Sequence, residues 1–150
     1  MNEVFRKYKD IHKGKRVFLI ANGPSLAETN LDLIKDEYSI AMNRISLIYP
    51  KTKWRPTYYL FCSTNVRPSK PWAEKWKKSI RETLAIEKTT SFIANAFRAN
   101  IDPYGDFMNT KWFDCLTETK PNLSGDVNET CFSTDVIERI DKTGSTINLA

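Results

Sequence analysis

Apolar residues occur along the chain in short runs separated by longer amphipathic stretches. The run Val17 to Ala21 contains no polar residue, which predicts a strand covered on both faces by helices, as in a parallel sheet. Residues rich in β-favouring side chains predict further strands at Tyr38 to Met42, Thr57 to Cys62 and Ser91 to Ala94. The predicted strands lie far enough apart for helical connections between them.

Helical spacing of apolar residues marks three of the intervening segments. The positions within residues 4–11 predict a first helix, which Gly14 ends. Ser25 to Lys35 predicts a second helix, with the Ser25 hydroxyl as its N-cap. Trp72 to Ile86 predicts a third, long helix. Residues 95–129 are expected to form a long irregular insertion.

The alternation of strands and helices predicts an α/β fold. We expect a Rossmann-like, doubly wound, mostly parallel sheet with helices on both faces, and residues 1–150 as a single nucleotide-binding domain. The apolar helical pattern that begins at Thr146 stops at Ala150 without a C-cap or a returning strand. The domain is therefore expected to be truncated at its C-terminus and inactive alone, with an apolar sheet edge that could pair with another copy as a homo-oligomer.

The charge gives little information about the binding partners, and the cysteine content bears on the cellular compartment. The formal charge of +5 favours anionic partners in general. The basic stretch Lys70 to Arg81 also carries Trp72, Trp76 and Ile80 at helical spacing, which predicts the solvated face of an amphipathic helix, with peripheral membrane contact as the alternative. The cysteines are odd in number and far apart, and are expected to be reduced thiols of a cytoplasmic protein: Cys62, Cys115 and Cys131.

A phosphate-handling loop is predicted where the first strand turns into the second helix, at Asn22-Gly23-Pro24-Ser25. Gly23 permits a positive φ or a close approach to a phosphate, and Pro24 suits the first position of a helix. The amides that follow, with Ser25, would present the positive end of the helix dipole to an anion. The Asn22 amide can donate and accept, which suits a ribose or a phosphate oxygen.

Polar residues also follow the next two strands. Asn43 comes after the second strand, and Ser63 to Asn65 after the third. Because ligands of such sheets bind beyond the carboxyl ends of the strands, we expect these residues to converge with the loop. The loop matches neither the GxGxxG fingerprint nor the Walker sequence.

Several segments together resemble one bacterial glycosyltransferase superfamily. They are VFLIANGPSL at 17–26, the Met-Asn-Arg end of the second strand, RPTYY at 55–59, FSTD at 132–135 and TGST at 143–146. The superfamily includes the CMP-sialic-acid-dependent sialyltransferases and the motility-accessory-factor glycosyltransferases, and the archaeal 6-hydroxymethyl-dihydropterin diphosphokinase has a similar domain. This resemblance covers nearly the whole chain, with little matching between Pro68 and Asn128.

The resemblance implies a donor site for CMP. The loop, with Asn22, Gly23 and Ser25, and also Asn43 would hold the nucleotide, and the small-residue turn Thr143-Gly144-Ser145 would touch it. Ala21 stands where the family usually has Gly, and Ser63 where it has Asn or Asp, with Asn65 as a possible substitute. The implied reaction transfers a nonulosonic acid from a CMP-sugar to a glycan or protein acceptor, with inversion and without a metal.

The sequence does not identify the catalytic residues. Such a transfer needs a general base and a group that stabilises the departing phosphate. His12 is the only histidine and precedes the first strand, so it is expected to be a surface residue. Two alternatives stay open. One is an ATP-dependent, pterin diphosphokinase-like enzyme using Mg²⁺ held by Asp102, Asp106, Asp114 and Asp126. The other is a basic nucleic-acid-binding module, although no nucleic-acid motif is present.

Overall fold

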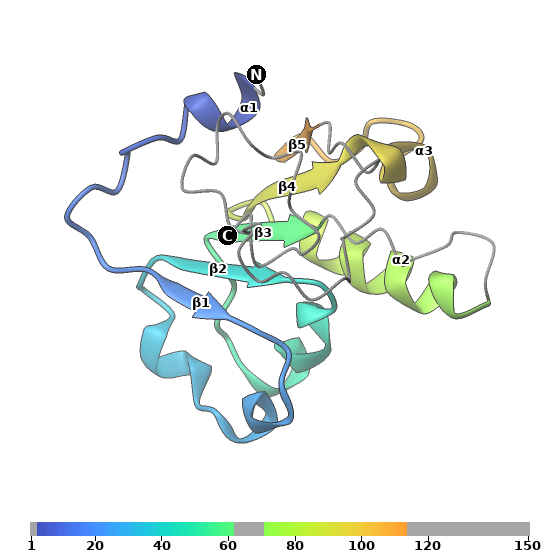
Figure 1. The fold of residues 1–150 in the computed structure, drawn as a ribbon. Helices are drawn as coiled ribbons and strands as arrows, with labels where there is room; N and C mark the ends of the chain where they lie inside the picture. The colour runs from blue at the N-terminus through green and yellow to red at the C-terminus, as the bar shows by residue number, and fades with distance from the viewer. Residues whose placement is uncertain (1–2, 62–70, 114–150) are drawn as a thin grey trace, which may run out of the picture.

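A single sheet of five parallel strands organises the computed structural model of this chain (Figure 1). The structure describes residues 3–61 and 71–113. The strands are β1 (Phe18–Ile20), β2 (Ser39–Met42), β3 (Tyr58–Phe61), β4 (Thr90–Ala94) and β5 (Thr110–Phe113). The helices are α1 (Glu3–Arg6), α2 (Pro71–Leu84) and α3 (Arg98–Ile101), with 3-10 segments η1 (Pro24–Glu28), η2 (Leu31–Ile34), η3 (Ile45–Lys51) and η4 (Asn95–Phe97).

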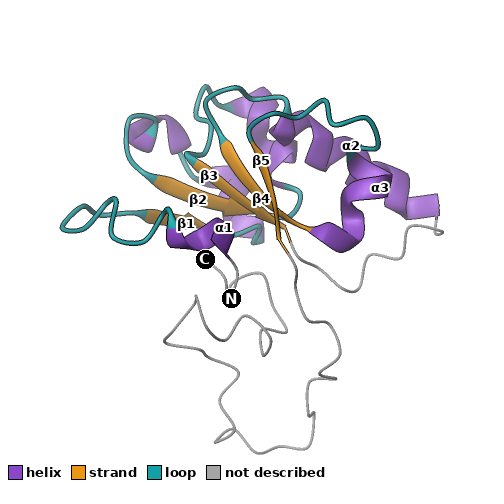
Figure 2. Ribbon diagram, turned by 90° about the horizontal axis from the view of Figure 1, so that it is seen from above, coloured by secondary structure: helices purple, strands orange, loops and turns teal. Residues whose placement is uncertain are grey.

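The strand order is β1-β2-β3-β4-β5, and every neighbouring pair is parallel. Figure 2 shows the strands side by side in one layer, with helices outside it. The predicted α/β class, with a parallel sheet and helices, is confirmed. Because the order is sequential, the described strands contain no reversal of strand order, the feature that marks the ligand crevice of a doubly wound sheet. The carboxyl ends of all five strands nevertheless lie at one edge.

Aromatic side chains join helices to both faces of the sheet. On one face, the ring of Phe5 in α1 lies 5.2 Å from the rings of Phe92 and Phe113. On the other face, the ring of Phe61 lies 5.9 Å from that of Trp76 in α2 and 4.9 Å from that of Phe97 in η4. These spacings are typical of favourable aromatic pairs, so the helices are fixed to the central strands.

The core lies around β3 and β4, where large side chains are fully enclosed. Trp54, Tyr59 and Phe61 are 0% exposed, and Ile93 and Phe113 are at most 1% exposed. Each fully buried side chain of this size contributes about 1.5–3 kcal/mol relative to leaving it in water. Strand β3 is therefore the best anchored part of the carboxyl edge.

The first strand differs from its prediction. Leu19, in the middle of β1, is 49% exposed, and Val17 just before it is 53% exposed. The expectation that helices cover this strand on both faces is wrong, because β1 lies at the edge of the described sheet and α1 covers the far end near β5. The other predicted strands agree with β2, β3 and β4 to within a residue or so.

The first two predicted helices are shorter than expected. The segment Ser25 to Lys35 forms two separate 3-10 segments, η1 and η2, because Asn30 begins a new cap by accepting a hydrogen bond from the backbone N–H of Asp32. The N-terminal helix ends at Arg6, and the chain continues in turns to Gly14, which has a φ of +78°. The long helix α2 agrees well with its prediction, and its basic side chains Lys75, Lys78 and Arg81 are exposed as expected.

The prediction of a long irregular insertion over residues 95–129 is wrong for residues 95–113. Residues 95–113 contain η4, α3 and β5, and β5 adds a fifth strand to the described sheet by pairing with β4. The sequence of β5 is a run of only four residues that includes the charged Lys111, so it gives little strand signal. Residues 114–129 of the expected insertion lie outside the described residues. Within the described ranges, no helix is both long and apolar enough to cross a membrane.

Candidate functional site

The carboxyl ends of β1 and β2 are joined by a side chain of the predicted loop. The Asn22 amide nitrogen Nδ2 donates a hydrogen bond to the Met42 carbonyl oxygen, 2.8 Å away. Met42 is the last residue of β2, and Asn43 follows it. The structure therefore brings the loop and Asn43 together at one edge of the sheet, as the sequence predicts.

The backbone at Asn43 is held in an uncommon conformation. Its φ is +55°, in the left-handed region that asparagine tolerates better than most residues. The Tyr59 hydroxyl donates a 2.5 Å hydrogen bond to the Asn43 carbonyl oxygen. Burial raises the pKa of this phenol well above its ordinary value, so it stays protonated and remains a donor. The turn after β2 is thus anchored to the sheet core.

The loop from Gly23 to Ser25 is open to solvent and differs in detail from its prediction. Gly23 has a φ of −71° and is the N-cap of η1, so no positive φ is required there. A Cβ added at Gly23 would meet only the Ser25 Oγ, at 3.9 Å, which leaves room for close approach to the backbone. Pro24 is the first residue of η1, as predicted, whereas Ser25 lies inside η1 and is not the N-cap. The helix-dipole argument weakens, because η1 is a 3-10 segment of five residues.

Arg44 extends the site beyond the predicted residues. It directly follows Asn43 and precedes η3, and its guanidinium carbon lies 5.8 Å from the centroid of the Trp76 ring. The Arg44 Nε is buried and has no hydrogen-bond partner among the described residues. A cationic group with an unsatisfied donor therefore stands at the same edge as Asn22 and Asn43.

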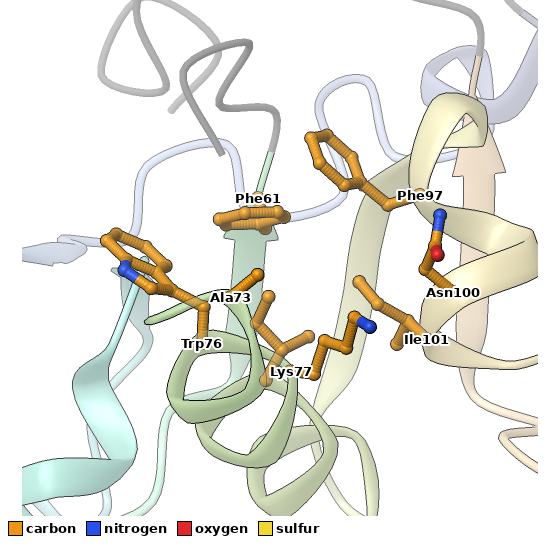
Figure 3. A pocket seen from close by; sticks show the side chains of 8 residues that line it. Phe61, Ala73, Trp76, Lys77, Phe97, Asn100 and Ile101 are labelled. Atoms are coloured by element: carbon orange, nitrogen blue, oxygen red, sulfur yellow. The ribbon is translucent and has the colours of Figure 1, made fainter. Parts of the chain in front are cut away.

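A narrow apolar cleft lies beyond the end of β3, between α2 and the segment formed by η4 and α3 (Figure 3). The rings of Phe61, Trp76 and Phe97 line it, together with Ile101. Lys77 and Asn100 also line it. The cleft is too small for a nucleobase. The Trp76 ring, which lines it, is also the ring beneath the Arg44 guanidinium.

Three residues at this edge were missed by the sequence analysis. Arg44 belongs to the Met-Asn-Arg segment but was not selected, and Tyr59 acts through a contact that only the folded sheet creates. Asn95 directly follows β4, as Asn22 and Asn43 follow their strands. The position of an asparagine just after a strand was the signal that could have identified Asn95.

Other predicted positions are not described by the structure. They are the predicted nucleotide-binding residues Ser63, Asn65, Thr143, Gly144 and Ser145, the three cysteines, and the expected C-terminal truncation. The assignment of these residues to the site stays a prediction.

His12 lies at the opposite edge of the sheet. Its Nε2 is 2.6 Å from the Tyr58 hydroxyl, at the start of β3, and its ring centroid is 3.9 Å from that of Tyr38, just before β2. The residue is half-buried, so the expectation of a plain surface residue holds only in part. Its position at the amino ends of the strands separates it from Asn22 and Asn43.

Carboxylates do not gather into a metal site in the described part of the chain. No group of three or more His, Cys, Asp or Glu residues there could hold a metal ion. Asp102 is 3% exposed, and its Oδ1 accepts a 2.7 Å hydrogen bond from the backbone N–H of Asp106. Its role is to close the turn that leads into β5. Asp114 and Asp126 lie outside the described residues.

Comparison with known proteins gives no match for this chain, whether with family models, curated proteins or solved structures.

Proposed function

We propose that this chain binds the donor nucleotide of a glycosyltransferase, a CMP-activated sialic acid or related nonulosonic acid, at the carboxyl edge of β1 and β2. The observation that supports the proposal is the hydrogen bond from the Asn22 side chain to the Met42 carbonyl, which joins the loop to Asn43. Two strand ends that present amide groups side by side form the kind of edge at which parallel sheets bind ligands.

The groups at this edge suit a nucleoside monophosphate. Asparagine side chains both donate and accept hydrogen bonds, as recognition of ribose hydroxyls and phosphate oxygens requires. The backbone at Gly23 is open, so a phosphate oxygen can approach the amides of the loop closely. The loop side chains are exposed, which leaves them accessible to a ligand.

Sugar transfer needs more than donor binding. A general base must reach the acceptor hydroxyl, and the histidine of this chain stands at the amino edge, bonded to Tyr58. We therefore assign donor binding to the described edge and assign no catalytic residue. The acceptor in this proposal is a glycan or a protein.

The diphosphokinase alternative receives less support. Magnesium between phosphates needs oxygen ligands that are not used elsewhere, and the Asp102 carboxylate is used within its own turn. The asparagine-rich edge fits a monophosphate without a metal better than it fits a metal-bridged triphosphate.

Calorimetric titration of the chain with CMP, CMP-sialic acid and ATP tests the proposal. We expect saturable binding of CMP without Mg²⁺, and weaker binding of ATP whether or not Mg²⁺ is present. Gly23→Ala is the informative variant. The site has room for the methyl group and an ordinary φ, so the fold should persist while a bound phosphate is crowded. Preference for ATP with Mg²⁺, or unchanged CMP binding by Gly23→Ala, would contradict the proposal.

A further inference from the structure

The guanidinium of Arg44 differs from those of Arg55 and Arg81 in its unused donors. The guanidinium groups of Arg55 and Arg81 each donate two hydrogen bonds to backbone carbonyls. The guanidinium of Arg44 forms no hydrogen bond and no ion pair with any described residue, and its Nε is buried. A buried donor without a partner is costly, so the unpaired Nε needs an explanation, and a bound ligand would supply one.

The position of Arg44 is fixed by its neighbours on both sides. Asn43 before it is held by the buried Tyr59 hydroxyl, and η3 after it packs against α2. The Trp76 ring, itself packed against Phe61, lies 5.8 Å from the guanidinium carbon. A cation held over an aromatic face keeps its edge donors directed away from the ring, where they can meet a ligand.

We propose that Arg44 is the anion-binding residue of the carboxyl edge, and that its guanidinium binds the phosphate of the donor nucleotide. The inference rests on the proposed function for the identity of the ligand. It also adds a side-chain cation to the expected chemistry of the site, since the guanidinium binds the phosphate beside the amides of the loop at Gly23 and the dipole of the short segment η1 is not required. A guanidinium fits a phosphate with two parallel hydrogen bonds, which a planar fork of donors provides.

The sugar acid carries a carboxylate that offers the same chemistry. CMP, cytidine, CMP-sialic acid and free sialic acid separate the two sources of negative charge. If Arg44 binds the phosphate, Arg44→Met should lower affinity for CMP by about tenfold to a hundredfold and leave affinity for cytidine unchanged. A loss confined to CMP-sialic acid and free sialic acid would overturn the phosphate assignment.

Arg98→Met is the matched control. The Arg98 guanidinium carbon lies 5.7 Å from the Trp112 ring centroid, in the same arrangement as Arg44 over Trp76, but on α3. We expect Arg98→Met to bind CMP as the unaltered chain does. Arg44→Lys keeps the charge and loses the fork of donors, so its affinity should fall between those of the unaltered chain and Arg44→Met. Thermal unfolding of each variant shows whether it still folds.

A second readout separates this inference from the proposed function. The Nε–Hε resonance of Arg44 can be followed by NMR in the unaltered chain while CMP or inorganic phosphate is added. If CMP does not bind but phosphate shifts this resonance saturably, the donor proposal fails and the anion site stands. If CMP binds and Arg44→Met binds it equally well, the anion assignment is overturned and the donor proposal stands. The inference is also overturned if neither ligand moves the resonance.

Discussion

The hydroxyl of Tyr59, buried in the centre of the sheet, donates a 2.5 Å hydrogen bond to the carbonyl oxygen of Asn43 at its edge. The phenol ring is 0% exposed, so its position is fixed by the core. Asn43 therefore takes its left-handed conformation on a rigid support, and the candidate site inherits its geometry from the packing of β3.

Removing that hydroxyl should weaken the site more than the fold. Tyr59→Phe keeps the ring and leaves the Asn43 carbonyl without its partner, which should lower the free energy of unfolding by about 0.5–1.5 kcal/mol. We expect a larger proportional loss in CMP affinity, measured by calorimetry beside urea unfolding. Tyr58→Phe is the control, because it removes a hydroxyl bonded to His12 at the opposite edge. Equal losses of CMP affinity in the two variants would contradict this account.

The backbone and side-chain roles of Asn43 can be separated. Glycine adopts a φ of +55° without strain, whereas valine in this region should lower the free energy of unfolding by about 1–2 kcal/mol. Asn43→Gly should therefore fold almost as stably as the unaltered chain but bind CMP more weakly. Chemical denaturation of Asn43→Gly and Asn43→Val measures the change in stability, and calorimetry measures the change in CMP affinity. Full CMP affinity in Asn43→Gly would show that the side chain does not contact the ligand.

Asp32 links two crossover connections and should make the fold sensitive to acid. Its Oδ1 accepts hydrogen bonds from the Thr52 hydroxyl at 2.6 Å and from the backbone N–H groups of Lys53 and Trp54 at 2.8 and 3.0 Å. The Thr52 hydrogen bond, aided by the two backbone bonds and the charge of Lys53, lowers the pKa of Asp32 below its ordinary value of 3.8. The stabilisation is therefore complete above that value and is lost as pH falls through the lower folded pKa.

Asp32→Asn tests this expectation through the melting temperature as a function of pH. The variant should melt below the unaltered chain at neutral pH, and the difference should shrink as pH falls below 3.8. Asp36→Asn is the control, because the Asp36 side chain is 84% exposed and pairs with Lys35. A difference between Asp32→Asn and the unaltered chain that stays constant down to acid pH would show that the carboxylate charge does not matter.

Trp54 should be the most costly side chain to truncate outside the strands. It is 0% exposed, and its Nε1 donates a 3.2 Å hydrogen bond to the Ser39 hydroxyl of β2. Trp54→Ala should lower the free energy of unfolding by about 3–5 kcal/mol. Leu33→Ala, at a position 81% exposed, should change it by less than about 0.5 kcal/mol. Urea unfolding of both variants measures the contrast.

The sequence predicted the strands whose apolar pattern reflects burial. Strands β2, β3 and β4 lie within the sheet, so their composition records the contacts that fix them. Strand β1 has an equally apolar sequence but lies at the edge of the described strands, and a single sequence does not reveal which strand takes that place. The helix expected from Ser25 broke at Asn30, because a side chain that caps a helix competes with continuing one.

The sequence predicted those residues of the candidate site that can be recognised from their type and their position after a strand. Asn22 and Asn43 each follow a strand, and their convergence follows from parallel pairing. The contributions of Tyr59 and Arg44 depend on distances between segments far apart in the chain. The Tyr59 hydroxyl reaches the carbonyl of the residue that follows the neighbouring strand β2, and the Arg44 guanidinium lies over a ring of α2. No spacing along the chain predicts either contact.

The most direct test of donor binding at this edge is an NMR titration of the ¹⁵N-labelled chain with CMP in the absence of Mg²⁺. The account predicts saturable shifts of the backbone amides of Asn22, Gly23, Ser25, Asn43 and Arg44, with no shift at His12 or Tyr58 on the opposite edge. Shifts confined to the opposite edge or to the basic face of α2, or no saturable shifts at all, would contradict it.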